Sequence, residues 1–146
     1  MKNGILIHME SIDMGGVNIT NSLKNSLLLD FKSAESIKIS KKDTLNQNII
    51  DIINFSVYNL ANELLNICHN VSVRYNYNFD NIILTGGCSN LSGIVEVFKD
   101  VFEDKSILFR NAFDNIKYYD RDIQFPQEIS NTFSNCVGLA IAKYKK

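Results

Sequence analysis

The chain has few of the residues that build metal centres or disulfide frameworks. Its 146 residues include three cysteines and two histidines. Cys68, Cys88 and Cys136 lie far apart without Cys-x-x-Cys spacing, so the sequence predicts neither a metal site nor a disulfide framework, and we expect reduced thiols. No apolar run approaches the ~20 residues that span a bilayer, and no signal peptide precedes the fold. We therefore expect a cytoplasmic protein, whose association with a membrane would come through a partner or through a segment missing from this sequence.

The sequence also lacks an excess of charge of either sign and the common catalytic motifs. The net charge is −1 and the lysines and arginines are scattered, which argues against nucleic acid as a partner. Neither a G-x-G-x-x-G fingerprint nor a Gly-Lys-Ser/Thr phosphate loop occurs. No Ser/His/Asp or Cys/His arrangement can be argued, so no catalytic residue is predicted. The 45% hydrophobic and 21% charged residues are typical of a globular domain, or of one half of something larger.

Hydrophobic periodicity predicts strands that alternate with helices. The expected strands are residues 4–12, 81–85 and 106–110, and the expected helices are residues 19–27, 33–38, 45–73, 91–102 and 128–145. The last helix has one apolar face, on which Gly138 would allow close packing. Residues 111–127 contain the only proline and are expected to hold a surface loop. The longest helix has a stripe that we interpret as core, formed by Ile49, Ile53, Val57, Leu60, Leu64, Ile67 or Cys68, and Val71. This order favours an α/β fold with a small, mostly parallel sheet flanked by helices.

The most informative stretch runs from Ile82 to Ile94, where an apolar strand meets Gly86 and Gly87 and then an amphipathic helix. Glycine has no Cβ, so a ligand can approach bare backbone at such a turn. The following helix would present free N–H groups and the positive end of its dipole. The pattern indicates a nucleotide-binding corner, although a Gly-Gly pair between a strand and a helix is more often an ordinary turn.

Four segments in order resemble the bacterial actin-like ATPases of the FtsA and PilM type. They are Gly15-Gly16-Val17-Asn18-Ile19-Thr20, Ala34-Glu35-Ser36-Ile37-Lys38, Leu84-Thr85-Gly86-Gly87-Cys88-Ser89-Asn90-Leu91-Ser92-Gly93-Ile94 and Cys136-Val137-Gly138-Leu139-Ala140-Ile141-Ala142. The third is similar to the adenosine motif of that group. The resemblance implies an actin-like, ribonuclease H-like lobe. The short stretch between Lys38 and Leu45 makes the PilM branch of type IV pilus assembly the closer match, because FtsA proteins usually carry a longer insertion there.

The two phosphate loops of this family, which precede the first of these segments, do not occur in the sequence. The resemblance therefore implies that residues 1–146 form a single C-terminal lobe, completed by its own N-terminal lobe or by a partner that supplies it. Phosphoryl transfer depends on Mg²⁺ held near the missing loops, so we expect ATPase activity only in the completed protein.

The resemblance implies an ATP or ADP site with Mg²⁺, with cofactor-binding residues Gly86, Gly87, Cys88, Ser89, Asn90, Glu35 and Lys38. Adenine and ribose would lie against the glycine turn, with Asn90 offering an amide. Glu35 would accept from ribose hydroxyls and Lys38 would lie near the base or the α-phosphate. Without the resemblance, Glu35 and Lys38 read as a surface ion pair worth about 0.2–0.5 kcal/mol, and Cys88 as a small filler.

Three functions remain open at this stage. The first is a nucleotide-binding lobe that acts as a scaffold for an inner-membrane pilus or division assembly, at which it would be peripheral. The second is a non-catalytic interaction module that has lost nucleotide binding. The third is a lobe of a small-molecule kinase or enzyme activator of the same fold. An exposed inter-lobe face would also make self-association possible.

Overall fold

The computed structural model describes residues 5–113, 116 and 126–144. The chain divides into two compact units, Met1–Phe79 and Asp80–Lys146. The first unit contains α1 (Gly16–Leu27), α2 (Phe31–Lys38), the 3-10 turn η1 (Lys42–Thr44) and α3 (Gln47–Tyr75). The second contains β1 (Asn81–Ile83), the 3-10 turn η2 (Gly87–Asn90), α4 (Ile94–Val101), β2 (Ser106–Leu108) and α5 (Gln127–Tyr144).

Side-chain caps fix where the helices of the first unit begin. The carboxylate of Asp30 accepts from the Ser33 N–H at 3.0 Å and starts α2. The Asn46 side chain accepts from the Ile49 N–H at 3.0 Å and starts α3. Such caps satisfy N–H groups that have no partner within the helix. The cap of α2 thus lies three residues before Ser33, which the sequence suggests for this role, and the cap of α3 lies two or three residues after the suggested Asp43 or Thr44.

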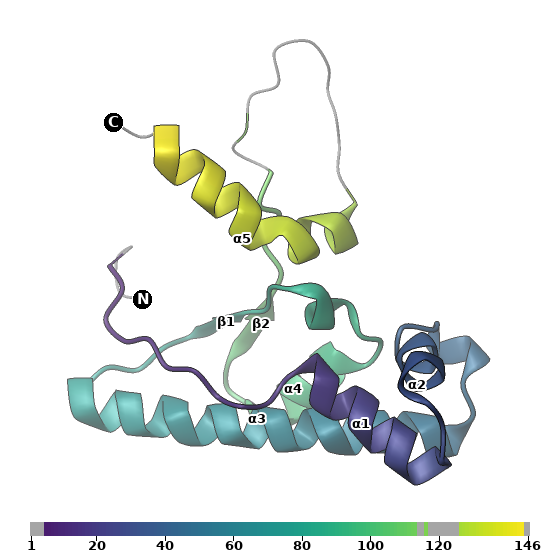
Figure 1. Cartoon of the computed structure of the whole chain (residues 1–146). Coiled ribbons are helices and arrows are strands. Elements are labelled where there is room, and N and C mark those ends of the chain that lie inside the picture. The colour runs from purple at the N-terminus through teal and green to yellow at the C-terminus, as the bar shows by residue number, and fades with distance from the viewer. Residues whose placement is uncertain (1–4, 114–115, 117–125, 145–146) are drawn as a thin grey trace. The chain divides into compact units, whose positions relative to one another are not determined.

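The core of the first unit lies where α1 packs on α2 and α3, over the N-terminal half of the long helix (Figure 1). Leu23 and Val57 are at most 1% exposed, and burying one such side chain contributes about 1.5–3 kcal/mol. The buried apolar residues of this unit are Ile19, Leu23, Ala34, Ile53, Val57 and Ala61. The stripe predicted for α3 is thus confirmed as core at Ile53 and Val57, while its later positions from Leu60 to Val71 are only partly buried.

The second unit is a parallel β–α–β arrangement. β1 and β2 pair in parallel with Asn81 opposite Ser106 and Ile83 opposite Leu108, and α4 connects them and contacts β2. The helix buries Ile94, Val97 and Phe98. The Phe98 ring stacks on that of Phe102 with centroids 5.8 Å apart. The predicted α/β class and the parallel pairing are confirmed, in a sheet that has two strands among the described residues.

A strand was predicted at residues 4–12, and none forms over its described part, residues 5–12. Ile5 makes an isolated bridge and residues 6–12 have no regular secondary structure. The segment follows α3 toward its C-terminal end (Figure 1), with Met9 83% exposed. Apolar alternation predicts which face a strand would bury, but a strand also needs a hydrogen-bonding neighbour.

The last helix is present where predicted, but the packing expected of it is not. Phe133 is 50% exposed and Leu139 is 75% exposed. A Cβ at Gly138 would meet no atom within 4 Å, so the close approach predicted there is wrong for the described residues. Instead, α5 buries the polar residues Ser130 and Asn131 near its start. The loop predicted at residues 111–127 lies largely outside the described residues.

Candidate functional site

The glycine turn, residues Gly86–Asn90, follows β1 in the second unit. Gly86 has φ 91° and ψ 168°, a region of backbone conformation that is essentially restricted to glycine. Its N–H donates to the Asn131 carbonyl at 2.8 Å. The structure therefore explains Gly86 by backbone geometry alone.

Gly87 has a different environment. It is exposed, its φ is not positive, and a Cβ built on it would meet no atom within 4 Å. The N–H groups of Gly87 and Cys88 are the first two of η2 and donate to no other described residue. No packing within the described chain requires glycine here, and two donors with open space before them are what a close-lying ligand needs.

Ser89 and Asn90 hold the turn in shape. The Ser89 hydroxyl is buried and donates to the Gly86 carbonyl at 2.7 Å. The Asn90 amide donates to the Glu128 carbonyl at 3.0 Å and to the Thr132 hydroxyl at 3.2 Å, and its oxygen accepts from Asn131 at 2.8 Å. Both amide hydrogens of Asn90 are thus donated to α5, which leaves none for the ligand contact expected of this side chain.

The helix that follows the turn begins later than predicted. The sequence suggested a helix from Leu91, directly behind the glycines, whereas η2 comes first and α4 begins at Ile94 after Gly93, whose φ is 88°. A groove of about 430 Å³ lies over η2 and the starts of α4 and α5. It is lined by Ser89, Asn90, Leu91, Gly93, Ile94, Val95, Glu96, Phe109, Gln127, Glu128 and Asn131. Gly87 and Cys88, the first two residues of η2, are not among the residues that line this groove.

In the first unit, Glu35 and Lys38 are brought together with Thr20. The Lys38 ammonium donates to Glu35 Oε2 at 2.7 Å, to Thr20 Oγ1 at 2.9 Å and to the Gly16 carbonyl at 3.2 Å. The Thr20 hydroxyl lies 2.5 Å from Glu35 Oε2. An ammonium group has three hydrogens, and all three are accounted for by these contacts.

Burial separates the roles of these three side chains. The Lys38 side chain is 7% exposed and Thr20 is fully buried, whereas the Glu35 side chain is 39% exposed. The predicted ion pair between Glu35 and Lys38 is present, but its lysine is a buried link between α1 and α2. The resemblance implies that Lys38 contacts a base or an α-phosphate. In this arrangement its ammonium group has no N–H left to donate to either.

The hydrogen bonds from Lys38 and then from Thr20 lower the pKa of Glu35 below the ordinary glutamate value of 4.5, against a smaller opposing effect of desolvation. These bonds favour the charged carboxylate. All of them end on Oε2, and no buried polar side-chain atom among the described residues lacks a partner. The other oxygen, Oε1, is therefore open to solvent.

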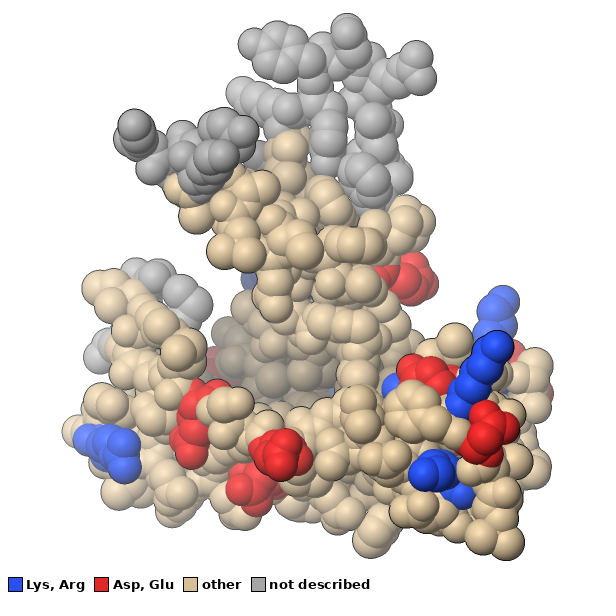
Figure 2. All heavy atoms as spheres, viewed as in Figure 1, with Lys and Arg blue, Asp and Glu red and all other residues tan. Residues whose placement is uncertain are grey.

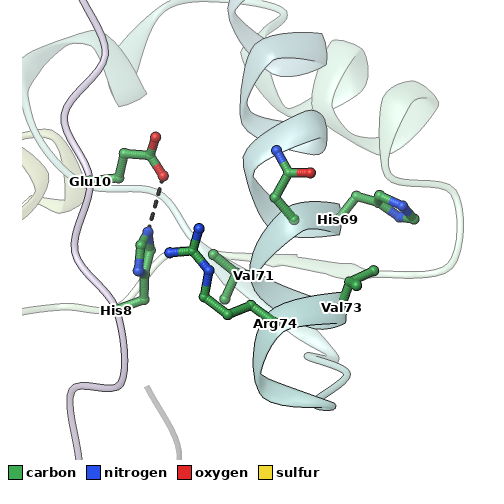
Figure 3. Close-up of a pocket in the computed structure, with 7 residues that line it drawn as sticks. His8, Glu10, His69, Val71, Val73 and Arg74 are labelled. Carbon is green, nitrogen blue, oxygen red and sulfur yellow. Dashed lines mark hydrogen bonds and ion pairs between the residues drawn. The ribbon is translucent and has the colours of Figure 1, made fainter.

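A second pocket, of about 620 Å³, lies in the first unit beside the end of α3 (Figure 3). His8 Nε2 lies 3.0 Å from a carboxylate oxygen of Glu10, and the His8 ring packs 6.0 Å from that of Tyr75. Figure 3 shows the Arg74 guanidinium reaching toward His8, with His69 pointing away. Because a carboxylate and a guanidinium both line this pocket, its charge selects neither anions nor cations. Among the described residues no three His, Cys, Asp or Glu side chains converge to hold a metal ion.

The charged side chains form no large field of one sign on the visible face. Figure 2 shows acidic and basic residues interspersed over a mostly uncharged surface, as far as the described residues reach. None of the helices in the described part of the chain combines the length and apolar character required to cross a bilayer.

A glycine turn in a parallel β–α–β unit, with the G-G-x-x-I-T and A-E-x-x-K segments on two packed helices, is the pattern that resembles actin-like proteins. The family model described as cell division protein FtsA matches residues 1–133. The chain belongs to the FtsA family, whose members are actin-like scaffolds of cell division. Searches of the curated proteins and of the solved structures found no match.

The two glycines of the turn should respond differently to alanine. Gly86→Ala places a Cβ at φ 91° and should lower the free energy of unfolding by about 1–3 kcal/mol. Gly87→Ala adds a Cβ that meets no atom within 4 Å and should change it by less than about 0.5 kcal/mol. Urea denaturation followed by circular dichroism measures both. Equal losses for the two variants would contradict this account of the turn.

The lowered pKa of Glu35 predicts a pH dependence of stability. The stabilisation from its charged form is complete above the ordinary value of 4.5 and is lost as the pH falls through the lower folded-state pKa. Urea midpoints measured from pH 6 downward should therefore fall more steeply below 4.5 in the wild type than in Glu35→Gln. Glu63→Gln, at an exposed glutamate of α3, is the matched control and should follow the wild type. Parallel curves for the wild type and Glu35→Gln would refute the assignment.

Proposed function

We propose that the chain binds a purine nucleotide, ATP or ADP, at the glycine turn of its second unit. The observation that carries this proposal is the open space at Gly87, where a Cβ would meet no atom within 4 Å. The N–H groups of Gly87 and Cys88 donate to no described residue, and Gly86 fixes the shape of the turn. A flat base or a ribose can lie against such backbone, because no side chain keeps it away. The turn also belongs to the segment that resembles the adenosine motif of the actin-like ATPases.

The residues at the turn fit a nucleoside better than a triphosphate. No lysine or arginine lines the adjoining groove, and Glu96 and Glu128 do. The described residues contain no cluster of acidic side chains that could hold Mg²⁺, so the metal would arrive with the nucleotide. No described residue is assigned to hydrolysis. The role that follows is a scaffold of an inner-membrane assembly, in which nucleotide binding controls docking onto partners.

Nucleotide binding can be tested on the intact chain by NMR titration with ATP and Mg²⁺. We expect weak binding, on the order of millimolar, with the largest shifts at the amides of Gly87 and Cys88. Gly87→Val should abolish these shifts while the circular dichroism spectrum is retained, because the new side chain fills the open space before the turn.

Gly138→Val is the matched control. This glycine is in the same unit, is exposed, and has no atom within 4 Å of a built Cβ, but it lies on α5 away from the turn. The control variant should bind ATP like the wild type. Binding by Gly87→Val at wild-type strength would remove the turn from the site. A wild-type chain that binds no nucleotide would favour the interaction module that lacks this activity.

More specifically, we propose that the chain has a role like that of PilM in type IV pilus assembly. Residues 39–46 join α2 to α3 with only η1 within them. By resemblance, FtsA proteins of cell division carry a longer insertion at this place, and the short connection favours the pilus branch. Disruption of the gene should then remove pili and leave cell length unchanged. Filamentous cells with normal pili would favour the division role instead.

A further inference from the structure

We infer that Asn131 of α5 is a positioning residue, which holds the glycine turn so that the N–H groups of Gly87 and Cys88 stay open to a ligand. It acts through Gly86 and Asn90, to which it is hydrogen-bonded. This inference rests on the proposed nucleotide binding at the turn. It adds to that site the start of α5, which lies outside the four segments that carry the family resemblance.

The contacts of Asn131 reach the turn at both of its ends. Its backbone carbonyl accepts from the Gly86 N–H at 2.8 Å, and its side-chain amide donates to Asn90 Oδ1 at 2.8 Å. Its side-chain oxygen accepts from the Gln127 amide at 2.8 Å, which fixes the orientation of the amide group. The residue is 3% exposed, so water competes little for these bonds. One residue thus links the first and the last residue of the turn to α5.

The two open donors lie between these two anchored residues. Gly87 and Cys88 directly follow Gly86, whose carbonyl accepts from the N–H of Ser89 at 3.1 Å and from its hydroxyl at 2.7 Å. Gly87 is exposed and has no side chain that could hold it by packing. The direction of the open N–H groups therefore follows from the anchors, and donors that are fixed before binding lose less entropy when a ligand arrives.

The two side-chain bonds of Asn131 need an amide, which donates from one atom and accepts at the other. The Asn90 amide cannot turn over to offer a hydrogen to position 131. Its nitrogen already donates to the Glu128 carbonyl, which has no hydrogen to give in return. Asn131→Asp would therefore set one oxygen against another and push the turn away from the helix.

The test is NMR spectroscopy of the intact chain with and without ATP and Mg²⁺. Asn131→Asp keeps the size of the side chain and replaces its donor by an acceptor. The amide signals of Gly87 and Cys88 should then move before any nucleotide is added, and ATP should bind about tenfold more weakly than to the wild type. Thr132→Val is a milder variant at an exposed position, which removes one acceptor of the Asn90 amide and should weaken binding by about twofold.

Ser130→Ala is the matched control. Ser130 precedes Asn131 and is fully buried, but its hydroxyl accepts from the Ala112 N–H at 2.7 Å and does not bond to the turn. Like Asn131→Asp, this variant should lower the free energy of unfolding in urea. Its Gly87 and Cys88 signals and its affinity for ATP should nevertheless be those of the wild type.

Equal losses of ATP affinity in Asn131→Asp and Ser130→Ala would mark a merely structural role and overturn the inference. Wild-type affinity in a folded Asn131→Asp, or in Thr132→Val if Asn131→Asp does not fold, would overturn it too and leave the proposed function intact. A wild-type chain that binds no ATP would overturn the proposed function and this inference together. Weaker binding with moved signals in Asn131→Asp, beside an unchanged Ser130→Ala, supports the inference.

Discussion

The backbone conformation of Gly86 is the constraint on which the second unit depends. With φ at 91° and ψ at 168°, this residue lies three positions after the end of β1 and donates its own N–H to the Asn131 carbonyl of α5. The carbonyl group of Gly86 accepts from both the hydroxyl and the N–H of Ser89, which closes η2. Any other residue at this position would strain these contacts, because residues with an L side chain rarely adopt this backbone conformation. The open backbone at Gly87 exists because its neighbour fixes the turn.

The first unit has a comparable fixed point in the ammonium group of Lys38. A buried cation is costly unless every hydrogen finds an acceptor, and here the three acceptors come from α1 and α2. The ion pair thus has a structural function that the i,i+3 spacing alone would not give it. A surface pair of this kind contributes little, whereas a buried ammonium makes its partners hard to remove.

Local patterns in the sequence predicted much of the fold. The long helix was expected at residues 45–73 and is found at Gln47–Tyr75, and the strand, glycine turn, helix and strand of the second unit occur in the expected order. These elements are encoded by neighbours in sequence: apolar periodicity, caps and glycines. The failures involve contacts between distant residues. Residues 5–12 alternate like a strand but form none, and the Asn90 amide donates to Glu128 and Thr132, which are far away in the sequence. Thr20 was quoted as part of a motif but given no role, since only the packing of α1 on α2 brings it to Glu35.

The two units follow the same rule for which polar groups remain available. The sequence suggested the Lys38 ammonium and the Asn90 amide as donors to a ligand. Both already donate all of their hydrogens to other groups of the chain. What remains open is a backbone donor pair at Gly87 and Cys88 and a single carboxylate oxygen at Glu35. Backbone N–H groups and a pre-oriented oxygen lose little conformational entropy on binding, whereas a free lysine would have to be ordered first. Recognition by such groups is selective for the placement of acceptors and hydroxyls on a ligand and gives little affinity from charge.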